Sequence, residues 1–130
     1  MKLTAAHISL AICMLICLAT TAFAQQDKFV GTWRGSYTLN GMVVSTEVIY
    51  MADGTFSAMQ TSGNGYASRI TGTYSFPSPG MIHYVNQDWT PKELHLPATE
   101  DDQYEFLSPT TFRSRPLLPG IPWMTSEKIQ

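Results

Sequence analysis

The chain has 130 residues and a formal net charge of −2, with 14% charged and 44% hydrophobic residues. This length is enough for one domain with a single core. The nearly neutral charge, without any basic block, argues against nucleic acid or an anionic membrane surface as a partner. Both cysteines, Cys13 and Cys17, lie in the first 24 residues, so no disulfide is expected to stabilise the rest of the chain.

Residues 1–24 have the pattern of an export signal. Lys2 gives a positive start, residues 8–19 form an apolar run, and Ala22-Phe23-Ala24 offers the small residues after which a signal peptidase cleaves. The apolar run is too short to span a bilayer, and no second run follows it, so we expect a cleaved signal and no membrane anchor. The prediction is a bacterial protein exported to the periplasm or the medium.

The segment 29–39 sets the pattern of the folded part. Every second residue, from Phe29 through Trp33 to Leu39, is apolar, aromatic or glycine, and most residues between them are polar. A period of two predicts a β-strand with one face in a core. Asn40-Gly41 then favours a type I′ turn, so the next strand is expected to return antiparallel.

Further segments with strand character follow, separated by turn residues, and no helical periodicity is found after the signal. The acidic run Glu100-Asp101-Asp102 is expected in a solvated loop over residues 90–102, which could cover one end of the sheet as a lid. The prediction is an all-β antiparallel up-and-down meander that forms a barrel or half-barrel of about seven to eight strands. The further segments are 42–51, 55–61, 66–76, 81–89, 103–107 and 110–115.

Four short motifs accompany this pattern: Gly31-Thr32-Trp33, Asp53-Gly54-Thr55-Phe56, Gly72-Thr73-Tyr74 and Thr111-Phe112-Arg113. Together they resemble the small exported bacterial proteins with a lipocalin-like domain, over most of residues 25–115. The resemblance implies that Trp33, with Gly31, closes the floor of a barrel. It also implies that a basic residue near the end of the domain, Arg113 or Arg115, packs across the ring of Trp33. The family has no single function to transfer.

The strand phases place seven aromatic residues on inner faces. A small domain needs large side chains to fill its core, which is the simpler explanation of these rings, but the same rings could line a pocket for an apolar ligand. Both interpretations stay open at this point. Beside Phe76, the inner aromatic residues, which are our candidates for ligand contact, are Trp33, Tyr37, Phe56, Tyr66, Tyr74 and Trp89.

Little in the sequence points to catalysis. No cysteine remains after residue 24, no Gly-x-Ser-x-Gly motif occurs, and only His83 and His95 remain as histidines. Acidic residues near these histidines are expected to be solvated and not to bind a metal ion. We therefore predict no catalytic residue, no metal and no cofactor.

Residues 116–130 form a proline-rich tail outside the predicted β domain. Its prolines favour an extended chain, and four large apolar residues lie among them: Leu117, Leu118, Ile121 and Trp123. The tail could pack back over the barrel with Trp123 as anchor, or present these side chains to another protein, such as a secretion component or an enzyme to be inhibited. The overall prediction is a non-catalytic binding module for a small apolar ligand inside the barrel or, alternatively, for a protein partner.

Overall fold

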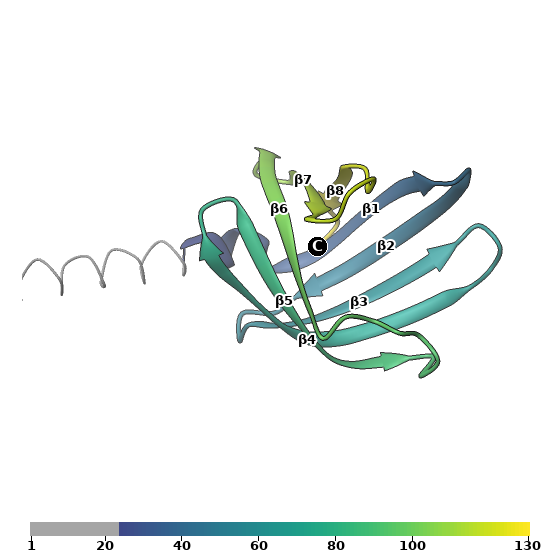
Figure 1. Cartoon of the computed structure of the whole chain (residues 1–130). Helices are drawn as coiled ribbons and strands as arrows, with labels where there is room; N and C mark the ends of the chain where they lie inside the picture. The colour runs from purple at the N-terminus through teal and green to yellow at the C-terminus, as the bar shows by residue number, and fades with distance from the viewer. Residues whose placement is uncertain (1–23) are drawn as a thin grey trace, which may run out of the picture.

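The computed structural model describes residues 24–130, so the export signal expected over residues 1–24 lies almost entirely outside the described residues. Eight strands pair antiparallel in chain order, and the last pairs with the first, so the sheet closes into a barrel (Figure 1). The all-β meander expected from the sequence is confirmed. The strands are β1 (Gly31–Leu39), β2 (Met42–Tyr50), β3 (Thr55–Ser62), β4 (Ala67–Ser78), β5 (Met81–Thr90), β6 (Thr99–Ser108), β7 (Thr111–Pro116) and β8 (Met124–Lys128).

The first hairpin has the predicted turn. Asn40 and Gly41 have φ angles of 51° and 76°, as a type I′ turn requires at both central positions. Leu39 pairs with Met42 across this turn, which fixes the register of β1 against β2 along the whole hairpin.

Strand β8 corrects the expectation that the β domain ends at residue 115. Met124 pairs with Ser114 of β7, and Lys128 pairs with Trp33 of β1. This short strand follows a proline-rich loop, so its alternation is too brief to be recognised from sequence alone. Its formation satisfies the backbone groups of two strands that would otherwise be sheet edges. The barrel therefore extends to residue 128.

Residues 24–29 form a short helix, where the sequence predicted no helix after the signal and a first strand that begins at Phe29. Phe29 is completely buried, and its carbonyl oxygen accepts a hydrogen bond of 2.7 Å from the indole Nε1 of Trp33. The hydroxyl of Tyr104 donates to Oε1 of Gln25 at 2.9 Å. Tertiary burial of Phe29 thus overrides the local strand pattern, and the helix covers one end of the barrel (Figure 1).

The aromatic core lies at this helix-covered end. The ring of Phe29 is 5.0 Å, centroid to centroid, from each of the rings of Tyr104, Phe106 and Phe112, all in edge-to-face contact. Such contacts add to the free energy gained by burying the rings. The hydrophobic core comprises Phe29, Trp33, Tyr50, Phe56, Ala58, Tyr74, Ile82, Tyr104 and Phe112.

Strand β6 begins at Thr99, earlier than the predicted residue 103, so the acidic run lies in a strand and not in a loop. Side chains alternate along it. Asp101 points outward, where its Oδ1 lies 2.7 Å from Nδ1 of His83, whereas Asp102 is buried and Glu100 is half-buried on the inner face. The connection from β5 to β6 is correspondingly shorter than expected, over residues 91–98.

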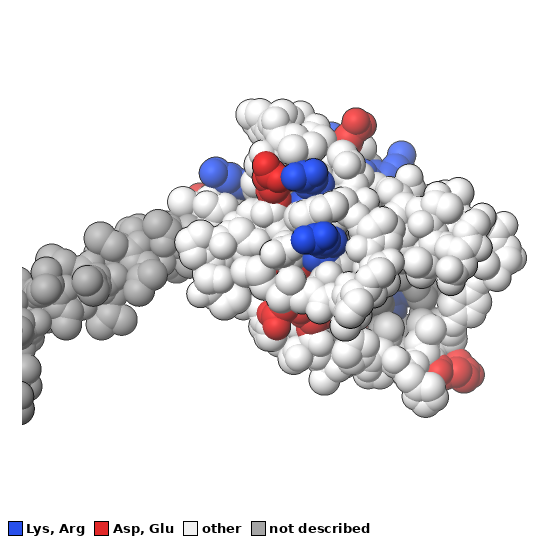
Figure 2. All heavy atoms as spheres, turned by 45° about the horizontal axis from the view of Figure 1, so that its top comes forward, with Lys and Arg blue, Asp and Glu red and all other residues white. Residues whose placement is uncertain are grey.

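The outer surface is mostly uncharged. Figure 2 shows one face on which a few Lys, Arg, Asp and Glu side chains are scattered among uncharged residues. Several of the charges are paired across neighbouring strands, for example Arg34 with Glu47 at 2.9 Å. Over residues 24–130, the structure contains no helix with the length and apolar character needed to cross a membrane.

Candidate functional site

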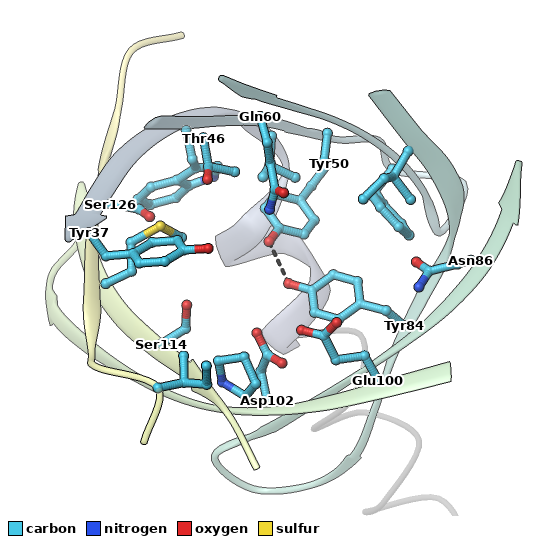
Figure 3. A pocket seen from close by; sticks show the side chains of 18 of the residues that line it. Tyr37, Thr46, Tyr50, Gln60, Tyr84, Asn86, Glu100, Asp102, Ser114 and Ser126 are labelled. Carbon is cyan, nitrogen blue, oxygen red and sulfur yellow. Dashed lines mark hydrogen bonds between the residues drawn. The ribbon is translucent and has the colours of Figure 1, made fainter. Parts of the chain in front are cut away.

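A cavity of about 260 Å³ occupies the barrel interior beyond the aromatic core (Figure 3). All eight strands contribute side chains to its wall. The loop 91–98 and the loop 117–123 add residues at the end of the barrel away from the helix 24–29. The cavity is therefore closed on one side by the core and bordered on the other by two loops.

Much of the lining is apolar. Trp33 and Phe112 extend from the core into the cavity wall, so the same rings that fill the closed end also face the empty space. An apolar wall of this kind favours an organic ligand over bulk water. The apolar residues along the strands are Trp33, Val48, Phe56, Ala58, Ile70, Phe112, Pro116 and Met124, and those from the two loops are Leu96, Leu118, Ile121 and Pro122.

A hydrogen-bonded tyrosine pair crosses the cavity. The hydroxyl oxygens of Tyr50 on β2 and Tyr84 on β5 lie 2.6 Å apart (Figure 3). Burial raises the pKa of both phenols, so both are neutral at physiological pH. Each hydroxyl can form one further hydrogen bond, so both can hydrogen-bond a ligand in this otherwise apolar space.

Two carboxyl groups lie beside this pair. Glu100 and Asp102 project from β6 into the cavity, next to each other (Figure 3). Burial raises the pKa of Asp102 to about 8, and the negative charge and hydrogen-bonding contact of Glu100 add to the rise. The pair therefore holds a proton near neutral pH that two exposed carboxyl groups would release.

Two buried oxygen atoms of the cavity wall lack a hydrogen-bond partner within the described residues: Oδ1 of Asp102 and Oγ1 of Thr46. The exposed fractions of these residues are only 8% and 5%. Buried polar atoms are almost always hydrogen-bonded in folded proteins, so these two atoms call for a partner that protein side chains do not provide.

The charge of the cavity wall has one sign. Among the described residues that line it, Glu100 and Asp102 are acidic and none is Lys, Arg or His. Over residues 24–130, no group of three His, Cys, Asp or Glu side chains is placed to hold a metal ion. The remaining polar wall consists of neutral groups, namely Tyr37, Thr46, Tyr50, Gln60, Tyr84, Asn86, Ser114 and Ser126.

Of the six predicted ligand contacts, Trp33, Tyr37 and Phe56 line the cavity. Tyr74 is buried in the core outside this lining, where its hydroxyl donates to the carbonyl oxygen of Met51 at 2.7 Å. The other two predicted contacts also lie outside the lining: Tyr66 is 47% exposed, and Trp89 is half-buried.

The prediction missed Tyr50, Tyr84, Glu100 and Asp102 as site residues. In the 81–89 segment the sequence placed His83 and Trp89 on the inner face, but the structure places Tyr84 inside. A register shift between β4 and β5 breaks simple alternation near Trp89, and a pattern of period two does not reveal such a bulge. The signal that could have found Asp102 was alternation with the buried Tyr104.

The expected packing of Arg113 or Arg115 across Trp33 is wrong. The guanidinium carbons of these arginines lie 4.6 Å and 4.5 Å from the ring centroid of Trp123, and Nζ of Lys128 lies 5.8 Å from that of Trp33. The reason is the additional strand β8, which lies between β7 and β1 and pairs Lys128 with Trp33.

Gly31 has a φ of 134°, and a Cβ there would lie 2.5 Å from the carbonyl oxygen of Gln130, which fits a role in closing β1 against the C-terminal strand.

The predicted tail folds over the open end. Leu117 and Leu118 are 53% and 61% exposed, whereas Ile121 is half-buried in the cavity lining and Trp123 is half-buried against the two arginines. The four side chains therefore do not form the single exposed patch that a protein partner would need. In the structure, the tail packs back onto the barrel.

Comparison with known proteins supports the fold alone. No protein-family model and no curated protein sequence matches the chain. One similar solved structure is a designed protein titled "De novo design of a fluorescence-activating beta barrel", with 16% sequence identity and a TM-score of 0.54. The match covers 81% of this chain and 96% of the designed one. The chain thus shares a small antiparallel barrel with this protein, and the lipocalin-like resemblance stays a prediction.

Proposed function

We propose that this protein is an exported, non-catalytic binding module that holds one small, mainly apolar ligand inside its barrel. The observation that carries the proposal is the cavity of about 260 Å³, which combines an apolar wall with a few convergent polar groups. Small-molecule sites in proteins have this composition, because apolar contact gives affinity and a few polar groups fix orientation.

The open end supports access to this cavity. Leu96 and Leu118 belong to different loops, and both face the cavity from the end opposite the helix 24–29. Loops move more easily than paired strands, so a ligand can enter between them without opening the sheet. The aromatic core around Phe29 closes the other end and limits how deep a ligand reaches.

The alternative function, a protein-interaction module that uses the outer surface and the tail, has less support. It requires Leu117, Leu118, Ile121 and Trp123 to be available together, and two of these side chains are half-buried on the barrel. Exposed single leucines are common on soluble proteins and do not by themselves mark an interface.

A neutral environment-sensitive dye tests the proposed function. N-phenyl-1-naphthylamine is expected to bind with one saturable site and increased fluorescence. Ala58→Phe fills the cavity and should abolish this signal, because Ala58 is a buried wall residue of β3. Met59→Phe is the matched control, since the adjacent Met59 is 44% exposed on the outer face.

Equal dye binding by the Ala58→Phe and Met59→Phe variants would place the site outside the barrel and overturn the proposal. Melting curves of both variants establish that each is folded. Native mass spectrometry of protein purified from its host adds an independent readout, in which a retained small molecule is expected, and Ala58→Phe should lose it.

A further inference from the structure

The acidic pair has a fixed geometry. Glu100 and Asp102 are separated by one residue on β6, so their side chains leave the same face of the sheet with attachment points about 6.6 Å apart. Pairing with β5 holds both positions, and Asp102 is also paired with Pro116 of β7. The two carboxyl groups are therefore presented together on a rigid wall and not on a mobile loop.

A buried, unpartnered oxygen marks the same place. Oδ1 of Asp102 has no hydrogen-bond partner among the described residues, although Asp102 is only 8% exposed and lines the cavity. A buried carboxyl oxygen without a donor is costly, and a ligand donor removes that cost. The Asp102 side chain therefore lines the cavity with a hydrogen-bonding capacity that the described residues leave partly unused.

The charges of the cavity wall indicate which charge the ligand should have. The described wall has two acidic groups and no basic one, so a negative charge on the pair is not compensated by the protein inside the cavity. On the outer face of the same strand, Oδ1 of Asp101 lies 2.7 Å from Nδ1 of His83, so this carboxyl group has a hydrogen-bond partner from the protein. A positive ligand group would supply the missing compensation.

We propose that the ligand is a small amphiphilic cation, an apolar body with an ammonium or amidinium group that donates hydrogen bonds to Asp102 and Glu100. The apolar body lies against the wall formed by residues such as Phe56 and Ile70. This inference rests on the proposed function, because it names the chemical class of ligand for the same cavity.

Three probes of one size and different charge test the inference: phenethylamine, phenethyl alcohol and phenylacetate. In calorimetric titrations of the purified protein, the amine is expected to bind at least about tenfold more tightly than the neutral alcohol, as for a charged hydrogen bond. Phenylacetate should bind most weakly, since its carboxylate meets two acidic groups.

Substitutions in the acidic pair test whether these two residues cause the preference for the amine. Asp102→Asn and Glu100→Gln keep the side-chain shapes and remove a carboxyl group that can be ionised beside the bound amine, so each should reduce the tenfold preference for the amine to less than about threefold. Asp101→Asn is the matched control, because it removes a carboxyl group from the same strand on the outer face. This control should keep the full preference. Glu100→Gln, at a half-buried position, carries the test if Asp102→Asn does not fold.

Equal affinity for phenethylamine and phenethyl alcohol overturns this inference and leaves the proposed function standing, because a neutral ligand then suffices. An equal loss of preference in Asp101→Asn and Asp102→Asn also overturns it, since the effect would then be a general surface charge. Failure of all three probes and of the neutral dye to bind overturns both proposals.

Discussion

The hydroxyl groups of Tyr50 and Tyr84 hydrogen-bond to each other at 2.6 Å across the inside of the barrel, although their strands are not neighbours in the sheet. β2 and β5 lie on different parts of the wall, with β3 and β4 between them. This contact therefore connects regions that the backbone ladder joins only indirectly, and it does so beside the acidic pair.

Replacing Tyr84 by Phe tests the contribution of this contact to stability. The variant keeps the ring and removes one hydroxyl, which leaves the hydroxyl of Tyr50 in a buried place without its partner. We expect the free energy of unfolding in urea to fall by about 1–2 kcal/mol. Tyr66→Phe is the control with almost no change, because Tyr66 is 47% exposed.

The pH dependence of stability should reveal the buried carboxyl of Asp102. Its pKa is raised from the ordinary value of 3.8 to about 8. Between these pH values the folded protein keeps a proton that the unfolded chain releases, so the folded state binds more protons. The free energy of unfolding therefore decreases as pH rises from about 4 to about 8, by at most about 1.4 kcal/mol per pH unit, and levels off above.

Asp102→Asn should remove this slope, and Asp101→Asn should keep it. Urea unfolding at a series of pH values makes the comparison. The groups that face Asp102 are Glu100 on its own strand and the phenols of Tyr50 and Tyr84, which stay neutral in this pH range. A wild-type protein that gained stability steadily between pH 5 and pH 8 would contradict the assignment.

Proton linkage gives the binding proposal a second signature. A cation next to Asp102 favours its ionised form, so amine binding below about pH 8 should release a proton from this carboxyl. The affinity for phenethylamine is then expected to rise from pH 6 to pH 8, while that for phenethyl alcohol does not rise. Calorimetry in buffers with different ionisation enthalpies measures the released proton directly, and an amine affinity independent of pH would count against the linkage.

Gly72 offers a test of packing between β4 and β5. A Cβ at this position would lie 1.8 Å from the carbonyl oxygen of Val85, a backbone atom that cannot move away without shifting the strand. Gly72→Ala should therefore lower the free energy of unfolding by about 3 kcal/mol. At Gly63 the nearest atom would be 3.8 Å away, so Gly63→Ala is expected to have little effect. Thermal melting of the two variants makes the comparison.

Local patterns predicted the parts of the fold that depend on few residues. The turn at Asn40-Gly41 and the alternation around Trp33 follow from backbone preferences and from burial of one strand face, and both are present. The helix that contains Phe29 could not be predicted in this way. Its stability comes from inserting one ring among aromatic residues distant in sequence, Tyr104 and Phe112 among them.

The candidate site was predicted only in part, for a related reason. Trp33 and Phe56 are large, and their strand phase was clear, so they were placed correctly in the wall. Asp102 was assigned to solvent because acidic residues are rarely buried, and this rule fails where a cavity needs polar groups. Tyr84 was placed outside because the bulge in the β4–β5 pairing, between Tyr84 and Trp89, cannot be recognised from the alternation of the sequence.

The closing segment of the barrel combines a strand and a loop, and two deletions separate their roles. Truncation after Arg115 removes β8, which pairs with both β1 and β7, so two long sheet edges become free and the barrel opens. We expect this chain to be aggregated or unfolded at room temperature. Replacement of residues 117–122 by a flexible Gly-Ser linker of equal length keeps β8 and removes the loop residues that face the cavity.

The linker variant should keep its fold with a modest loss of melting temperature, because Trp123 still contacts Arg113 and Arg115, and cation–π contacts of this kind contribute about 0.5–1 kcal/mol each. Its dye affinity should fall severalfold, since Leu118 and Ile121 no longer cover the open end. The two measurements are the melting temperature and the titration with N-phenyl-1-naphthylamine. If the truncated chain melted like the intact protein, pairing of β8 would contribute nothing to closure, and the barrel would have to be stable as an open seven-stranded sheet.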